Sequence, residues 1–184
     1  GCNHPIWPSF GLIHGSRSSM DIGRDWNSFS HIGLENFHRN WQNGRLWWND
    51  PDCVLLTGKL PDNEFQVHAS TILATGGMVL SGDDLTKIAP NRLAMLRKLV
   101  PPRAAAAEFA DTTFRVGEIP GEKESIVCAF NWGDSPQNVR FSVAERCVMK
   151  DFWSDEDMGR CDGSYEIKDM PPHSAKVIVC SPEK

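Results

Sequence analysis

Two short apolar stretches that run into acidic residues decide the first part of the fold: RLWWNDPD at residues 45–52 and MVLSGDD at residues 78–84. Each stretch predicts a short buried strand, because it is apolar, brief and closed by turn-forming residues. Acidic residues at the carboxyl end of a buried strand are typical of an α/β barrel, in which the chemistry lies at that end.

Helical patterns surround these two strands. Apolar residues recur at helical spacing from residue 21 to about residue 42, again from about residue 62 to residue 75, and in a third stretch that ends near residue 100. Helices that alternate with short strands predict α/β architecture. We therefore expect residues 1–109 to form the C-terminal part of a TIM (β/α)8 barrel. Such a barrel takes about 250 residues, so its first part is expected to lie outside this sequence.

The period of the pattern changes to two after residue 111. Gly, Pro, Asn and Asp separate the alternating segments, as in proteins built from short antiparallel strands. Residues 110–184 are therefore expected to form an antiparallel β-sandwich domain, so that the whole chain combines an α/β part with an all-β part. The expected strands are Thr113–Glu118, Ser125–Asn131, Asn138–Val143, Cys147–Trp153, Ser164–Lys168 and Ser174–Cys180.

Composition excludes several functions. The chain has 184 residues, a formal net charge of −5 and a mean hydropathy of −0.37. It therefore lacks the excess of basic residues that nucleic-acid binding needs. Its apolar runs are far shorter than the roughly 20 residues of a membrane span. No nucleic-acid or membrane partner is expected.

The six cysteines do not suggest a metal or redox motif. They stand at positions 2, 53, 128, 147, 161 and 180, with no close CxxC pair among them. We interpret most of them as small buried side chains rather than as a disulfide framework. No metal site is expected, because the cysteines and histidines do not follow a standard ligand spacing.

Several carboxylates could carry chemistry or could serve local structure. Arg17 and Asp21 lie where a long Gly-, Pro- and Ser-rich segment gives way to a helical pattern. Asp21 could act as a proton donor in an enclosed cleft, or it could simply cap a helix. Asp50 and Asp52, at the end of a buried strand beside two tryptophans, could be catalytic, but local turns at Pro51 are the expected role. The pair Asp83-Asp84 is expected to cap the helix that follows.

Taken together, four motifs resemble the clan of retaining α-galactosidases, especially glycoside hydrolase family 36 and the related family 27. The likeness covers roughly residues 1–100, and the remainder fits the antiparallel β domain that follows the barrel in this clan. The motifs are specific as an ordered set, and none is specific alone. They are Gly1-Cys2-x-x-Pro5-x-x-Pro8-x-x-Gly11, Arg17-x-x-x-Asp21, Trp47-Trp48-Asn49-Asp50-Pro51-Asp52-Cys53 and Gly82-Asp83-Asp84-Leu85.

The resemblance implies a function and a role for three residues. Asp21 matches the general acid/base, Arg17 the arginine that contacts the sugar, and Cys2 the start of the loop that lines the galactose pocket. A retaining glycosidase uses two carboxylates: one attacks the anomeric carbon while the other protonates the leaving oxygen. This chemistry needs no cofactor, and its substrate would be an α-galactoside oligosaccharide.

The nucleophilic Asp of the family belongs to an earlier barrel strand, before Gly1. This chain alone is therefore expected to be inactive and to need the missing part of the barrel or a partner chain. Two other functions stay open. One is a non-catalytic carbohydrate-binding or assembly module with tryptophans as sugar platforms. The other is α-N-acetylgalactosaminidase specificity on the same scaffold.

Overall fold

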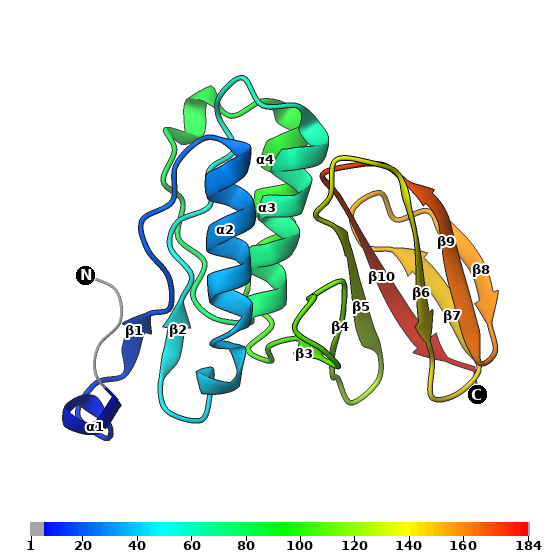
Figure 1. Ribbon diagram of the computed structural model, residues 1–184, viewed down its shortest axis with the longest axis horizontal. Helices are drawn as coiled ribbons and strands as arrows, with labels where there is room; N and C mark the ends of the chain where they lie inside the picture. The colour runs from blue at the N-terminus through cyan, green and yellow to red at the C-terminus, as the bar shows by residue number, and fades with distance from the viewer. Residues whose placement is uncertain (1–5, 184) are drawn as a thin grey trace. The chain divides into compact units, whose positions relative to one another are not determined.

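A computed structural model describes residues 6–183, which form two compact units that meet in sequence between Ala106 and Ala107 (Figure 1). This division falls three residues before the boundary inferred from the sequence. None of the helices that the described residues form combines the length and the apolar character needed to cross a membrane.

The first unit contains the helices. They are α1 (Ile6–Ser9), α2 (Trp26–Phe37), α3 (Asp62–Thr75) and α4 (Pro90–Leu99), with 3-10 turns η1 (Asn40–Gln42) and η2 (Leu85–Lys87). Two short strands, β1 (Gly15–Arg17) and β2 (Trp48–Asp50), pair in parallel. A further parallel bridge joins Val54 to Ser81.

Local signals set the ends of the helices. Asp25 caps α2 by accepting a hydrogen bond of 2.9 Å from the Ser28 amide. The helix α3 begins after Pro61 and ends at Gly76, whose left-handed φ of 64° lets the chain leave the last turn. The predicted second helix is thus confirmed. The first helix is shorter than predicted, because Asp25 rather than Asp21 is its cap.

The helices α2 and α3 lie side by side and share a buried aromatic contact (Figure 1). Phe29 of α2 stacks on His68 of α3 with 4.3 Å between ring centroids, and it meets Phe65 edge-on at 5.9 Å. All three side chains are almost entirely excluded from solvent. Burial of this apolar face, rather than helix propensity, holds the two helices in place.

The expected barrel portion is not present. The residues that the structure describes give the first unit one two-stranded parallel sheet and two isolated bridges, in place of a row of barrel strands. The predicted strand at residues 45–48 begins later, at Trp48. The predicted strand at 78–80 contributes only backbone hydrogen bonds, such as Met78 N–H to the Asn49 carbonyl at 2.8 Å. A barrel needs neighbouring strands on both sides, and segments this short cannot complete one alone.

The second unit is an antiparallel β domain, as predicted. Six strands form one sheet in the order β3-β4-β5-β10-β7-β8, and β6 pairs with β9 in a second. The pattern missed β3 and β8, which are short or lack regular alternation. The strands are β3 (Glu108–Phe109), β4 (Val116–Ile119), β5 (Ser125–Asn131), β6 (Gln137–Ser142), β7 (Cys147–Asp151), β8 (Asp157–Cys161), β9 (Ser164–Met170) and β10 (Ser174–Pro182).

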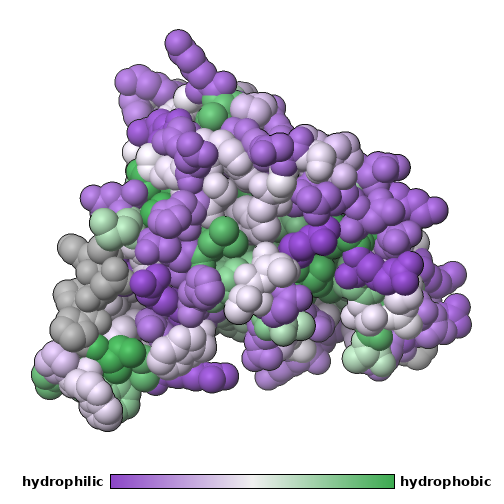
Figure 2. Space-filling view, viewed as in Figure 1, coloured by the Kyte–Doolittle hydropathy of each residue, from purple (hydrophilic) through white to green (hydrophobic). Residues whose placement is uncertain are grey.

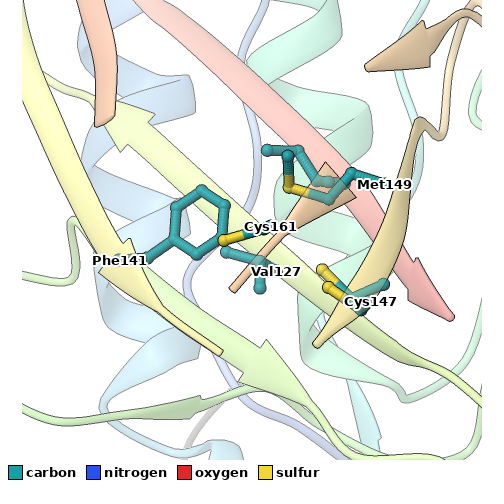
Figure 3. Packing of buried hydrophobic residues seen from close by; sticks show 7 residues of the cluster. Val127, Phe141, Cys147, Met149 and Cys161 are labelled. Atoms are coloured by element: carbon teal, nitrogen blue, oxygen red, sulfur yellow. The ribbon is translucent and has the colours of Figure 1, made fainter. Parts of the chain in front are cut away.

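The core of the second unit lies between its two sheets (Figure 3). Strand β7 shows why: its residues alternate between buried and exposed, so that Cys147, Met149 and Asp151 point inward. Val127, Phe141 and Cys161 pack against this face. The cysteines at 128, 147, 161 and 180 are buried free thiols and Cys53 is a half-buried one, as the sequence suggested for most of the six. Burial raises the pKa of the Cys128 thiol to about 12, so it stays protonated.

Candidate functional site

Polar side chains gather in the first unit where its parallel segments end. The loop 18–25 follows β1, the loop 51–61 follows β2, and residues 81–84 follow the bridge at Ser81. Because β1 and β2 are parallel, with Arg17 opposite Asp50, the loops that follow them start from the same edge. Residues distant in sequence are thereby brought together.

Arg17 is the centre of the first group of contacts. Its Nη2 donates to Asp21 Oδ1 at 3.2 Å and to the Met20 carbonyl at 2.9 Å, and it lies 2.8 Å from Asp52 Oδ2. The Arg17 side chain is mostly buried, whereas the Asp21 side chain is 94 % exposed. The predicted pair Arg17 and Asp21 is thus a real contact, and its carboxylate faces solvent.

Asp52 holds this arrangement in place. In addition to the Arg17 contact, its Oδ2 accepts a hydrogen bond of 2.8 Å from the Ile22 amide. Its Oδ1 accepts one of 2.7 Å from the Cys53 amide. Asp52 has a φ of 72°, in the left-handed region where Asp and Asn are the best tolerated residues after glycine. Both of its oxygens are engaged, so the carboxylate is bound in place rather than free to attack a substrate.

Asp50 has a local role in the turn, as expected. Its Oδ1 accepts from the Asp52 amide at 3.0 Å, and its carbonyl oxygen accepts from Ser18 N–H at 2.9 Å. Ser18 also donates to buried Asn36 at 2.6 Å, and Asn36 donates to the Pro51 carbonyl at 3.2 Å. The loops 18–25 and 51–61 are therefore joined by buried polar contacts and are held rigidly against α2.

Asp83 forms a second centre, which the sequence reading missed. Its side chain has no solvent exposure, and it accepts hydrogen bonds from the Leu56 amide, the Thr57 amide at 3.1 Å and the Thr57 hydroxyl at 2.5 Å. Arg24 completes the set at 2.7 Å. Capping was the expected role for both acids, but only Asp84 caps, by bonding to Thr86. The one sequence signal for this role of Asp83 is its position next to Gly82, directly after an apolar stretch.

The pKa of Asp83 is lowered in this environment. Burial alone would raise it, but hydrogen bonds from Thr57, Leu56 and Arg24 stabilise the charged form and outweigh that effect. Nearby, burial lowers the pKa of His68 to about 4, so the imidazole is neutral. Its Nε2 accepts from the Leu55 amide at 3.0 Å, which a charged ring could not do.

The Arg17 guanidinium has one buried nitrogen that takes no part in the contacts above. Arg17 Nε is buried and has no hydrogen-bond partner within residues 6–183. An unsatisfied buried donor costs about 1–3 kcal/mol, so an acceptor at this place would be favourable. Cys2, the third predicted site residue, lies outside the described residues. No group of three or more His, Cys, Asp or Glu side chains in the described part of the chain could hold a metal ion.

The fold is shared by solved glycoside hydrolases. A β-L-arabinopyranosidase from Geobacillus stearothermophilus, solved with arabinose, aligns over 93 % of this chain and 46 % of its own, with a TM-score of 0.79 and 16 % identity. An α-galactosidase from Mortierella vinacea aligns over 94 % of this chain and 54 % of its own (TM-score 0.76, 15 % identity). A Bacillus halodurans protein provisionally named an α-N-acetylgalactosaminidase aligns over 89 % of this chain and 44 % of its own (TM-score 0.77, 15 % identity).

The chain therefore shares its fold with part of these glycoside hydrolases, and it spans about half the length of these structures. The Geobacillus enzyme is a member of family 27, so the likeness is to family 27 and not to family 36, the family that the sequence motifs emphasised. No protein-family model matches the sequence.

Proposed function

We propose that this chain forms part of the active site of a retaining α-galactosidase-type glycoside hydrolase, which cleaves terminal α-D-galactosyl residues. In this proposal Asp21 is the general acid/base, Arg17 contacts the sugar, and Cys2, which lies outside the described residues, begins the loop that binds substrate. The observation that supports this proposal is the exposed Asp21 carboxylate held by Arg17, whose own position is fixed by Asp52. A solvent-facing acid on a rigid loop is suited to deliver a proton to a leaving oxygen.

The second carboxylate must come from polypeptide outside these residues. Asp52 shares the Arg17 guanidinium with Asp21 but has both oxygens bound, and Asp50 serves its turn. Apolar side chains left uncovered fit the need for further polypeptide. Trp7 is 90 % exposed and Leu12 76 %, and hydrophobic atoms gather around α1 at the lower left of Figure 2. We call the assembly that supplies the nucleophile the intact enzyme.

The proposal is tested by measuring hydrolysis of 4-nitrophenyl α-galactoside by the intact enzyme and by its Asp21→Ala variant. A general acid/base contributes roughly 10²–10⁴-fold, so a loss of this size is expected. Azide, which needs no general base, should restore part of the turnover with an activated aryl galactoside. Asp25→Ala is the matched control, because Asp25 is an exposed carboxylate on the same loop that caps α2. Equal losses in both variants would contradict the role of Asp21.

The chain of residues 1–184 alone should bind weakly and turn over nothing. Intact mass near 20.6 kDa together with a nitrophenyl galactoside assay checks this expectation. Turnover from a chain of that mass would mean that a carboxylate within it serves as nucleophile.

Substrate preference separates the related activities. The three structural neighbours suggest a panel of 4-nitrophenyl glycosides of α-galactose, α-N-acetylgalactosamine and β-L-arabinopyranose. α-Galactose and β-L-arabinopyranose differ only in the hydroxymethyl group on C5, and the third sugar differs at C2. We expect the highest kcat/KM on α-galactoside, and a higher value on either other sugar would assign that activity instead.

A non-catalytic carbohydrate-binding module is the second candidate. Trp41 and Trp48 are about half exposed and could stack on sugar rings. This function predicts that saccharide binding is retained in Asp21→Asn. It also predicts that the full assembly, defined above as the intact enzyme, turns over no glycoside. Calorimetry with galactose and a galactoside disaccharide distinguishes it from the enzyme.

A further inference from the structure

Arg24 and Asp83 connect two loops that are 59 residues apart in the sequence. Arg24 Nη2 lies 2.7 Å from Asp83 Oδ1 and 3.5 Å from the Gly82 carbonyl. The stem of Arg24 runs past Gly58, where an added Cβ would lie 3.7 Å from Arg24 Cδ. About half of the Arg24 side chain is exposed, so its head reaches from the surface to a fully buried carboxylate.

Asp83 is held by other donors in addition to Arg24. Three donors from Leu56 and Thr57 fix its two oxygens, so the carboxylate is an anchored acceptor. The backbone behind it is fixed as well, since Gly82 N–H donates to the Val54 carbonyl at 3.0 Å. A side chain on Gly82 would collide with Cys53 Sγ, so this close approach requires glycine.

The loop that carries Asp21 is thus attached on both sides of this residue. Asp52 binds Arg17 before Asp21 and the Ile22 amide directly after it, and the Met20 amide donates to Glu35 at 2.9 Å. Three residues after Asp21, Arg24 adds the contact with Asp83. The exposed Asp21 carboxylate lies in sequence between Arg17 and Arg24, and its own contact with Arg17 is a longer one at 3.2 Å.

We propose that Asp83, acting through Arg24, is a positioning residue for the acid/base carboxylate Asp21. This inference rests on the proposed function. Asp83 contacts no reacting atom. It fixes the loop three residues beyond Asp21, next to the Ile22–Asp52 contact, and thereby helps to set where the Asp21 carboxylate stands. A displacement of about 1 Å in a catalytic group can cost on the order of 100-fold in rate. Loss of this attachment should therefore reduce kcat with little change in KM.

The test is Arg24→Ala in the intact enzyme, with Asp83 left in place so that the buried carboxylate keeps its backbone donors. We expect kcat on an unactivated galactoside disaccharide to fall by about tenfold or more. On 2,4-dinitrophenyl α-galactoside, whose leaving group needs no proton, Arg24→Ala should lower kcat by a smaller factor. Added azide should make this decrease in kcat smaller still. Arg24→Lys keeps a cation that can reach Asp83, and it should restore most of the activity.

Lys87→Ala is the matched control. Lys87 pairs with Asp84 at 3.1 Å, next to Asp83 in the chain, and both side chains of this pair are exposed. Its removal should change kcat by less than about twofold, the scale of an exposed ion pair. Thermal unfolding of each variant shows whether the fold is retained.

Three results would overturn the inference. They are an active enzyme that Arg24→Ala leaves unchanged, a loss that is the same for every leaving group and insensitive to azide, and an equal loss in Lys87→Ala. An intact enzyme without any glycosidase activity would overturn the proposed function and this inference together. The first three outcomes leave the proposed function standing.

Discussion

The two units each bury an aspartate, and the two aspartates are held in different ways. Asp83 in the first unit takes hydrogen bonds from residues 26, 27 and 59 positions away. Asp151 in the second unit accepts from the amides of Trp153 and Ser154, two and three residues after it, and pairs with Lys176 on the neighbouring strand at 2.7 Å. The first arrangement ties separate loops together, whereas the second completes one turn and adds a contact with the adjacent strand β10.

In both cases the pKa of the carboxyl group is lowered. Burial would raise it, but hydrogen bonds outweigh burial, from Thr57 and Leu56 in one unit and from Lys176 and Ser154 in the other. Long-range polar contacts at the ends of parallel segments are therefore the feature that distinguishes a candidate site from a structural turn in this chain. Substituting each aspartate is the most direct test of whether it ties separate loops together or holds one turn.

The largest effect is expected for Asp83→Ala. It leaves several buried donors without an acceptor and should cost about 3–5 kcal/mol of unfolding free energy, the range for breaking a buried ion pair. Hydrogen exchange should also increase in both the loops 18–25 and 51–61. Asp151→Ala should increase exchange within the second unit, near residues 151–155 and the adjoining part of β10, and not in these two loops. Urea unfolding and hydrogen exchange measure both effects, and exchange confined to residues 83–87 in Asp83→Ala would contradict the role of Asp83 as a tie.

A truncation in the apolar core of the second unit should rank next. Met149 is fully buried in the cluster of Figure 3, and Met149→Ala should cost about 2–5 kcal/mol through lost burial and a cavity. Val148→Ala, on the exposed face of the same strand, is the control and should cost far less. Neither change should alter hydrogen exchange in the loop 18–25. A change there would show that the stability of the two units is coupled.

The sequence predicted the second unit better than the first. Strand β5 was predicted to the residue, because its boundaries coincide with turn-forming residues and its apolar run is continuous. In the first unit the helix α3 was predicted from Asp62 and Gly76, both local signals. The expected barrel strands failed because strand pairing depends on neighbours that local periodicity does not specify.

The site was predictable to the same limited extent. The spacing Arg17-x-x-x-Asp21 gave a contact that the structure contains, since four residues bring side chains close in many turns and helices. Arg24 and Asp83 could not be paired from the sequence, because their contact depends on how three loops fold together. The structural role of Asp52 likewise depends on Ile22, which is 30 residues away.

Acid should destabilise the first unit through His68. The folded pKa of about 4 lies below the ordinary value of 6.5, so the unfolded state binds more protons between these values. Unfolding free energy should therefore be highest above pH 6.5 and fall as the pH drops toward 4, by about 2 kcal/mol between pH 7.5 and pH 5. Urea unfolding at a series of pH values measures this dependence. The unfolding free energy should vary less with pH in His68→Gln, which keeps an acceptor for the Leu55 amide. An unchanged pH dependence in that variant would assign it to other groups.

The smallest expected effect belongs to the cap of α2. Asp25 accepts from the Ser28 amide, and Asp25→Ala should cost about 1 kcal/mol of unfolding free energy, whereas Asp25→Asn keeps an acceptor and should cost much less. Urea unfolding of the three proteins measures the difference.

Because Asp25 follows Arg24 directly, this variant also separates two explanations of how the loop 18–25 is held. If the start of α2 fixed the loop, Asp25→Ala in the intact enzyme would lower kcat as much as Arg24→Ala does. If the Arg24–Asp83 contact fixes it, the Asp25→Ala enzyme should keep its leaving-group dependence and respond to azide no more than the unsubstituted enzyme. A less stable helix with an unchanged kcat would assign the loop's position to the contact between the loops rather than to the helix that follows it.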